Sequence, residues 1–228
     1  MRLERVAILA PDFAAEREAM VERQLRRRGI TEKHILDAFL AVPREAFVAE
    51  EYAHSAYGDH PLPIEAGQTI SQPYIVAVMI QGAGVQTGHK VLEVGAGSGY
   101  AAAVISRIAA RVVGVERQHD LVAIARERMA LLGYENVEIV EADGTLGWQG
   151  EAPYDAILVA AGGSHVPQPL IDQLAPNGAI VMPIGSQGGV QTLLRVRKAV
   201  DGSIQQSDLG AVRFVPLIGE EGWSDDRS

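Results

Sequence analysis

The sequence predicts an α/β fold, a doubly wound and mostly parallel sheet with a helical N-terminal extension. After Gly88, short apolar runs alternate with amphipathic, helix-like segments. Strands that read as continuous apolar runs are typical of a parallel sheet covered on both faces. A glycine-rich turn at residues 95–99 joins one such strand to a small-residue helix, as in nucleotide-binding α/β domains.

The N-terminal part is predicted to be helical. Phe13, Met20, Val21 and Leu25 fall near helical spacing, and Asp12 is a candidate cap. We expect a second helix, capped by Thr31, to carry apolar residues 35, 36 and 39 and to end before the proline at 43. A turn-rich stretch over 52–72 follows.

The core is predicted to contain five strands, three of them followed directly by helices. The strands are 90–94, 111–116, 136–143, 154–161 and 178–185; the helices are 101–110, 120–133 and 167–175. Residues 191–200 and 202–217 predict one or two further strands at the sheet edge. We therefore expect one domain over 1–228, with an extension over 1–80, a nucleotide-binding core over 81–185 and edge strands over 186–228.

Composition excludes several classes of function. The 228 residues include no cysteine, which rules out disulfides, a thiolate nucleophile and cysteine-ligated metal. The apolar run "VAILA" is too short for a signal peptide or a membrane span, so we expect a cytoplasmic protein without a membrane partner. The net charge of −9 repels a phosphate backbone and argues against a nucleic-acid partner. The basic stretch 23–29 is interpreted as a solvated helix face, with a phosphate or partner patch as the alternative.

The turn in "LEVGAGSGY" is predicted to hold a ligand. Glycines at a strand-to-helix turn permit positive φ and let the backbone approach a ligand closely. The segment Gly95, Ala96, Gly97, Ser98 and Gly99 is therefore a candidate binding loop.

Acidic residues end the next two strands. Glu116 lies 21 positions after Gly95 (116 − 95), near the offset at which an acid binds a ribose diol. Asp143 ends the third strand and precedes Gly144. It could cap the turn there or accept a hydrogen bond from the exocyclic amine of adenine, and we favour the second role.

The type of nucleoside follows from a third acid. Glycine spacing here is G-x-G-x-G, whereas dinucleotide sites prefer G-x-G-x-x-G, and Glu93 lies two residues before the first glycine. A carboxylate there would repel a pyrophosphate but suits a ligand with ammonium and sulfonium charges. S-adenosylmethionine has both and is the predicted cosubstrate. The alternative is that the glycines serve packing and the acids are solvated strand ends.

The segment after the fourth core strand bears on the methyl acceptor. Residues 160–167, "AAGGSHVP", lack the Asn/Asp-Pro-Pro-aromatic pattern that would suit a flipped base. The small residues at 160–163 favour an open floor for a polypeptide backbone.

Several segments together resemble one family, protein-L-isoaspartate(D-aspartate) O-methyltransferase. They are "VPREAFV", "DHPLPIEAGQTISQPYIVAVM", "VLEVGAGSGY", "EADGTLGW", "YDAILVAA" and "VRFVPL", and they span nearly the whole chain. The resemblance implies a Rossmann-like, S-adenosylmethionine-dependent transferase that methylates the α-carboxylate of L-isoaspartyl residues. Its product is S-adenosylhomocysteine, and its partners are isomerised proteins or peptides. The ester collapses to a succinimide, whose hydrolysis returns some aspartate, so that the reaction initiates protein repair. A monomer is expected.

The resemblance also assigns an active-site segment. In the family, the Thr-Ile-Ser-Gln-Pro stretch lies as a substrate lid over the methyl-donor site, and its Ser is the active-site residue. That implies Ser71, with Thr69 beside it. We expect Ser71 to orient the acceptor by hydrogen bonding, because a carboxylate of pKa about 4 is already ionised at pH 7. The alternative is that Ser71 only caps the helix starting near Pro73.

Two departures from the family pattern leave substrate preference open. The loop "GGSHVP" at 162–167 is richer in glycine than expected for the family, and "VGVER" at 113–117 is a mild variant that keeps the ribose acid. His165 could contact substrate, and His119 is expected to start a helix. Arg213 is interpreted as a surface arginine, with attraction of the acceptor carboxylate as the alternative.

Rival functions are an NAD-dependent oxidoreductase, a non-catalytic binding homologue, and a methyltransferase of the same fold acting on another peptide or small-molecule carboxylate. The six histidines show no metal spacing, so no metal is expected.

Overall fold

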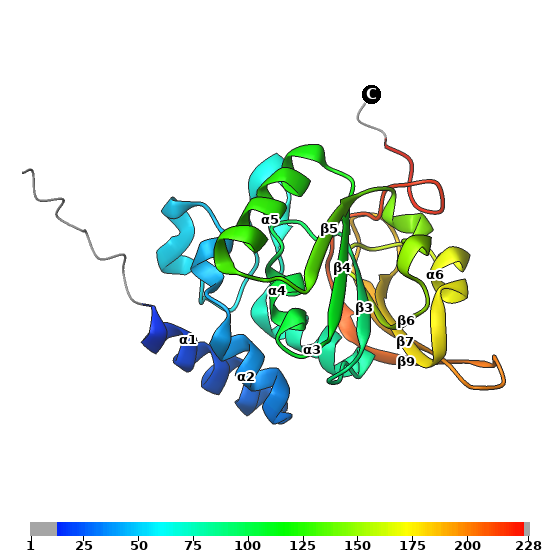
Figure 1. The fold of residues 1–228 in the computed structure, drawn as a ribbon, viewed down its shortest axis with the longest axis horizontal. Coiled ribbons are helices and arrows are strands. Elements are labelled where there is room, and N and C mark those ends of the chain that lie inside the picture. Colours follow the sequence, from blue (N-terminus) through cyan, green and yellow to red (C-terminus); the bar gives the residue numbers. More distant parts are fainter. Residues whose placement is uncertain (1–12, 226–228) are drawn as a thin grey trace, which may run out of the picture.

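A seven-stranded sheet forms the centre of the molecule, in the order β5-β4-β3-β6-β7-β8-β9 (Figure 1). The computed structural model describes residues 13–225. Pairing is parallel from β5 to β7, and β8 and β9 are antiparallel. The strands are β3 (Lys90–Val94), β4 (Arg111–Glu116), β5 (Val137–Glu141), β6 (Tyr154–Val159), β7 (Leu174–Ile184), β8 (Gln191–Lys198) and β9 (Ile204–Val212). The predicted fold class is confirmed, including two edge strands.

Helices cover both faces of this sheet. One face packs against helices α3 (Pro73–Ala83), α4 (Tyr100–Ser106) and α5 (His119–Leu132), and the short α6 (Gln168–Asp172) packs on the other. Side chains alternate along β3, so that Val91 joins the first core while Leu92 and Val94 join the second. Glu93 therefore points toward the α4 face, because residues two apart on a strand share a face.

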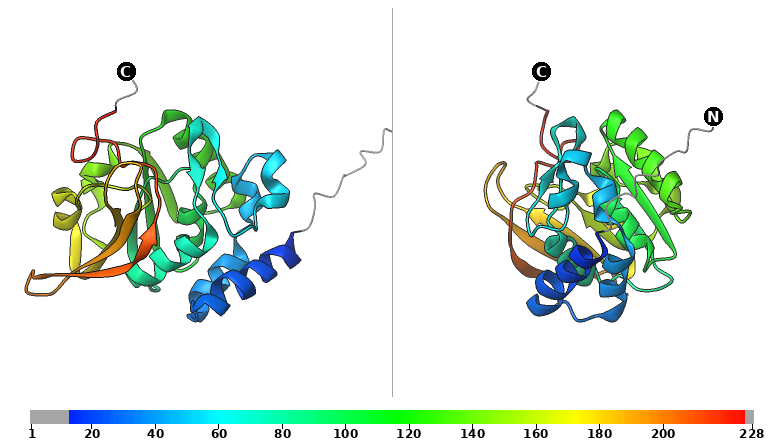
Figure 2. Two further views of the ribbon diagram at one scale, coloured as in Figure 1. Left: turned by 180° about the vertical axis from the view of Figure 1, so that it is seen from behind. Right: turned by 90° about the vertical axis from the view of Figure 1, so that its left-hand side faces the viewer.

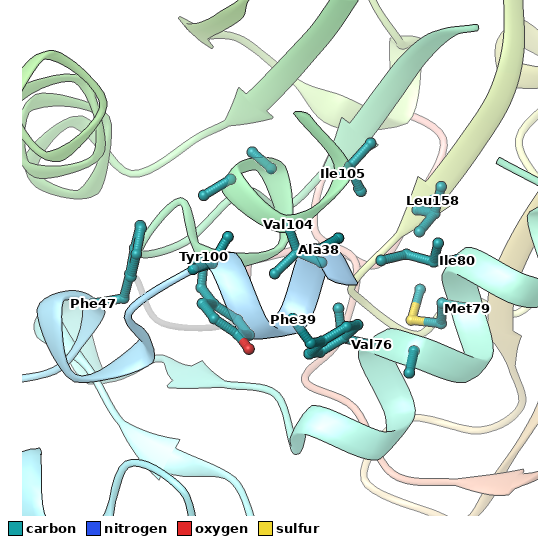
Figure 3. Close-up of a cluster of buried hydrophobic side chains, with 14 of the residues drawn as sticks. Ala38, Phe39, Phe47, Val76, Met79, Ile80, Tyr100, Val104, Ile105 and Leu158 are labelled. Atoms are coloured by element: carbon teal, nitrogen blue, oxygen red, sulfur yellow. The ribbon is translucent and has the colours of Figure 1, made fainter. Parts of the chain in front are cut away.

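The first part of the N-terminal extension packs against α3 and α4. It contains α1 (Ala14–Met20), which continues into the turns Val21–Leu25 and Arg26–Arg28, and α2 (Lys33–Ala41). Figure 3 shows Phe39 of α2 and Phe47 beside Tyr100 at the start of α4. The ring centroids of Phe39 and Phe47 lie 6.3 and 5.6 Å from that of Tyr100, in edge-on geometry. Figures 1 and 2 show the extension and the β8–β9 hairpin at opposite ends of the molecule.

Three details of the extension bear on the predictions. The expected Thr31 cap is wrong: α2 has Glu32 at its N-cap without a side-chain hydrogen bond, and the Thr31 amide donates to the Glu32 carboxylate. The first helix ends at Gly29, whose φ of 99° is typical of a helix C-terminus. Asp12 lies outside the described residues. Arg26 and Arg27 are exposed and pair with Glu22, which fits a solvated face.

Several element boundaries differ from expectation, and contacts with other segments account for two of them. Helix α4 ends at Ser106, because Asn136 donates its side-chain amide to the carbonyls of Ser106 and Ala109 and stabilises a turn there. Strand β7 begins at Leu174, within the predicted helix 167–175, because Leu174 pairs with Tyr154 of β6. Among residues 13–225, no helix is long and apolar enough to cross a membrane.

Candidate active site

A cavity of about 410 Å³ opens at the carboxyl ends of β3, β4 and β6. Ligands of open α/β sheets bind at this edge. Its wall includes three segments far apart in sequence: 67–71 from the extension, the turn after β3, and a C-terminal stretch. The residues proposed from sequence that line it are Thr69, Ser71, Glu93, Gly95, Ala96, Gly97, Ser98, Glu116 and Gly144.

The glycine turn has the conformation that its sequence predicts. Gly95 has φ 83°, a left-handed value that residues with a Cβ rarely adopt, and it lies on the cavity wall. Gly99 also has positive φ and is the N-cap of α4, but it is not on the wall. A Cβ on Gly99 would lie 2.8 Å from Cε of Met129 in α5, so the end of that flexible side chain would have to shift.

Glu93 is a buried acid on the cavity wall, with 2% of its surface exposed. Its Oε2 atom has no hydrogen-bond partner among the described residues. Burial, and secondarily the nearby Glu116, raises the pKa of Glu93 to about 8. Such a carboxyl favours a cationic ligand, which would stabilise its ionised form.

Glu116 has a different environment, although it lies on the same wall. Its Oε1 accepts hydrogen bonds from the amides of Arg117 (2.8 Å) and Gln118 (2.9 Å), and Oε2 accepts one from Gly97 (3.0 Å). The carboxylate thereby joins the end of β4 to the glycine turn. Because a carboxylate can accept about four hydrogen bonds, capacity for a ligand hydroxyl remains.

Asp143 caps the turn that it precedes. Its Oδ1 accepts from the amide and hydroxyl of Thr145 (2.9 and 2.7 Å), and Oδ2 accepts from the amide of Glu220 (2.8 Å). Burial raises its pKa, but the hydrogen bonds from Glu220 and Thr145 outweigh burial and leave the pKa below its usual value. Asp143 is not on the cavity wall, whereas Gly144 is. The capping role is observed; contact with adenine stays a prediction.

The 67–71 segment, which we call the lid, includes the second strand of a small hairpin, β1 (Leu62–Pro63) and β2 (Thr69–Ile70). Thr69 is exposed and Ser71 is half-buried. The interpretation of Ser71 as a helix cap is wrong, because Gln72 is the N-cap of α3 and no side chain caps it. In the part of the chain that the structure describes, the Ser71 hydroxyl has no hydrogen-bond partner, so it can contact a ligand.

The C-terminal segment was not predicted to reach the site. Residues 215–218, 224 and 225 line the cavity. The indole N–H of Trp223 donates to the carbonyl of Gly162 (2.9 Å), and Arg117 pairs with Asp225 at 2.8 Å. Contacts between residues more than sixty positions apart leave no local signal in the sequence.

Other residues considered from sequence lie off the wall. His165 is exposed beside the Ser164 hydroxyl, and Arg213 is exposed just after β9. His119 starts α5, as expected, and pairs with Glu141. No cluster of histidine, aspartate or glutamate among residues 13–225 could hold a metal ion.

Comparisons with known proteins identify the family. The sequence profile described as Protein-L-isoaspartate(D-aspartate) O-methyltransferase (PCMT) matches residues 15–222. Protein-L-isoaspartate O-methyltransferase 2 of Pelobacter propionicus is 52% identical over 207 residues, covering 91% of this chain and 92% of that protein. Protein-L-isoaspartate O-methyltransferase 1 of Rhodopseudomonas palustris is 50% identical over 215 residues, covering 94% and 88%.

Solved structures agree. A protein-L-isoaspartate O-methyltransferase structure matches with TM-score 0.83 and 33% identity, over 90% of this chain and 67% of that one. A Plasmodium falciparum structure, described as a beta-aspartate methyltransferase (PCMT) in complex with S-adenosyl-L-homocysteine, matches with TM-score 0.75 and 28% identity, over 89% and 98%. The chain belongs to the protein-L-isoaspartate(D-aspartate) O-methyltransferase family.

Proposed function

We propose that the protein transfers a methyl group from S-adenosylmethionine to the α-carboxylate of L-isoaspartyl residues in damaged proteins, leaving S-adenosylhomocysteine. The observation that carries this proposal is a single cavity whose wall includes both the lid and the glycine turn. Relatives about half identical over nine-tenths of the chain support the same activity. The methyl ester would then collapse to a succinimide, and hydrolysis would return part of the protein to aspartate.

The cavity residues fit the methyl donor. Glu93 has a buried, unpartnered oxygen and so favours a cationic group, while Glu116 retains acceptor capacity for a ribose hydroxyl. Gly95, Ala96, Gly97 and Ser98 let the backbone approach the bound molecule. Asp143 has accepted three hydrogen bonds and retains one acceptor position that the adenine amine could use. The donor supplies a methyl group already activated by its sulfonium.

The protein's own part in the reaction is orientation. The acceptor carboxylate is ionised at pH 7, with a pKa of about 4, so no general base is required. We assign to Ser71 the task of donating a hydrogen bond to one acceptor oxygen, with Thr69 beside it. Holding the reacting atoms in line at an approach of about 3 Å supplies much of the rate enhancement in such reactions. The lid would also exclude water from the cavity.

We further propose a cytoplasmic monomer that acts on isomerised proteins and peptides, and a single domain over 1–228. The absence of cysteine suits a reducing compartment, and the net charge of −9 disfavours nucleic acid. The extension (1–80), core (81–185) and edge strands (186–228) bury apolar residues in shared cores, which supports one domain.

The proposal is tested with labelled S-adenosylmethionine and two peptides that differ only in isoaspartate or aspartate at one position. We expect base-labile label on the isoaspartyl peptide alone. Equal label on both peptides would show that the protein does not distinguish isoaspartate from aspartate. Label on neither, with retained donor binding, would favour a non-catalytic homologue or another carboxylate substrate.

A further inference from the structure

Arg44 is a buried cation without an acidic partner. Its exposed surface is 0%, and it begins a short helical turn, Arg44–Phe47. Among residues 13–225, no carboxylate pairs with it, and its Nη1 has no hydrogen-bond partner. A buried charge without a counter-charge is costly, and an apolar side chain of similar volume is often at least as stable in such a place. Stability alone therefore does not account for an arginine here.

The contacts of Arg44 join the lid to the glycine turn. Nη2 donates to the carbonyl of Ser71 (2.9 Å), and Nε donates to the carbonyl of Ala56 (2.7 Å). The guanidinium carbon lies 4.6 Å from the ring centroid of Tyr100, which begins α4 directly after Gly99 and lines the cavity. The planar guanidinium can donate in two directions and stack at once, which a lysine ammonium cannot do.

A polar network in the extension holds Arg44 in place. Its amide donates to the hydroxyl of Tyr57 (3.2 Å), which also accepts from Nε of Arg17 (2.8 Å). The Tyr57 hydroxyl in turn donates to the carboxylate of Glu45. Figure 3 shows the ring of Tyr100 held between Phe39 and Phe47. Both partners of the stacking contact are thus fixed by their surroundings.

The positive charge of Arg44 lies near the place proposed for the acceptor carboxylate, which it would attract. The cavity wall includes the carboxylate of Glu116, which repels an acceptor carboxylate. Of the described wall residues, Arg117 is the one lysine or arginine, and it is paired with Asp225. Arg44 lies directly behind Ser71, with its charge uncompensated by an acid. In a buried, low-dielectric setting such a charge acts more strongly than it would in water.

We propose that Arg44 is a positioning and specificity-determining residue: its guanidinium fixes Ser71 relative to the donor turn and provides the positive potential that selects an ionised acceptor carboxylate. The inference rests on the proposed function and deepens it. Arg44 acts through the Ser71 segment and through its field, without contact with the transferred methyl group.

The test compares Arg44→Met, which keeps volume and removes charge, with Arg44→Lys, which keeps charge and loses the two-way hydrogen bonding. The control is Arg126→Met, since Arg126 also donates its Nε to a backbone carbonyl (Ile139, 2.7 Å) but is off the cavity wall. The readouts are kcat and KM for an isoaspartyl peptide, Kd for S-adenosylhomocysteine, and inhibition by the same peptide carrying an α-carboxamide.

In Arg44→Met we expect KM for the peptide to rise about tenfold, because the attraction between the Arg44 guanidinium and the acceptor carboxylate is lost. The preference for carboxylate over carboxamide should disappear, while Kd for S-adenosylhomocysteine stays within about twofold. Arg44→Lys should restore much of the preference but keep a kcat below the wild-type value, because the hydrogen bond to the Ser71 carbonyl is lost. Hydrogen exchange of residues 67–72 should be faster than in wild type. Arg126→Met should leave all of these values unchanged.

An unchanged carboxylate preference in Arg44→Met would overturn the proposal, as would loss of donor affinity in step with activity, since that indicates a merely structural role. If Arg44→Met does not fold, Arg44→Lys decides: wild-type kcat and wild-type exchange of residues 67–72 would overturn the positioning role. Wild-type protein that methylates no isoaspartyl peptide would instead overturn the proposed function, and this role with it.

Discussion

Glu93 and Glu116 lie on the same cavity wall but differ in the hydrogen bonds that their carboxyl groups accept. Three backbone amides stabilise the carboxylate of Glu116, whereas one oxygen of Glu93 has no partner among the described residues. The raised pKa of Glu93, about 8, means that its carboxyl is mostly protonated at pH 7 in the ligand-free protein. A bound ammonium or sulfonium would reverse that balance.

Binding of S-adenosylhomocysteine at pH 7 is therefore expected to release about one proton from Glu93. Calorimetric enthalpies should then differ between phosphate and Tris buffers, in proportion to the ionisation enthalpies of the buffers. Glu93→Gln should abolish the difference and weaken binding. Equal enthalpies in both buffers for the wild-type protein would show that Glu93 does not ionise on binding.

The same group affects the stability of the ligand-free protein. Because the pKa of Glu93 is raised on folding from about 4.5 to about 8, its contribution is full below pH 4.5 and is lost as pH rises through 8. The melting temperature should therefore fall less steeply between pH 5 and pH 9 for Glu93→Gln than for the wild-type protein.

Ser71→Ala should lower turnover by about tenfold or more, because one hydrogen bond that orients the acceptor is removed. Affinity for S-adenosylhomocysteine should change by less than about twofold. Ser164→Ala, an exposed change off the cavity wall, is the control and should have wild-type kinetics. A loss of donor affinity in Ser71→Ala would mean that the lid holds the donor.

At the scale of elements, the sequence predicts some boundaries of strands and helices better than others. Strands 90–94 and 111–116 were predicted to the residue, because each is an apolar run with a clear start and a clear end. The ends of α4 and β7 were not, because a side chain of Asn136 and a pairing with Tyr154 determine them from outside the segment. The Thr31 cap failed because the helix begins one residue later, where the amides of Ile35 and Leu36 donate to the carbonyl of Glu32.

Gly95→Ala tests the turn. The added Cβ would meet Ala160 only at an ordinary 3.7 Å, so its main cost is the positive φ, about 1–2 kcal/mol. Gly133→Ala has the same backbone problem with open space around the Cβ, and it ends α5 away from the cavity. Both variants should lose similar stability in urea melts, but only Gly95→Ala should raise Kd for S-adenosylhomocysteine, by about tenfold. Equal Kd values for S-adenosylhomocysteine in Gly95→Ala and Gly133→Ala would show that the turn is not part of the donor site.

At the scale of the whole molecule, distant segments enclose the cavity. The extension supplies the lid, and C-terminal residues supply another part of the wall, which the Trp223 indole and the Arg117–Asp225 pair hold in place. Sequence motifs indicated the glycine turn, Glu93 near the end of β3 and Glu116 at the end of β4, because these residues lie at strand ends. They did not indicate the burial of Arg44 or the C-terminal wall, which depend on contacts across the folded chain.

Ending the chain after Gly222 should weaken binding of S-adenosylhomocysteine by about tenfold, because contacts that close the cavity are lost. The seven strands all precede this point, so the circular dichroism spectrum should stay unchanged. A chain ending after Asp225 keeps both contacts and is the matched control. Equal affinity in the two truncated proteins would show that the segment 223–225 contributes nothing to donor binding.

A single cavity is proposed to hold the methyl donor beneath the lid that carries Ser71. A crystal structure of the protein with S-adenosylhomocysteine would locate the donor. We expect this molecule against Gly95–Ser98, with its ammonium near Glu93 and its ribose at Glu116. If S-adenosylhomocysteine were bound anywhere else on the protein, the cavity would not be the methyl-donor site.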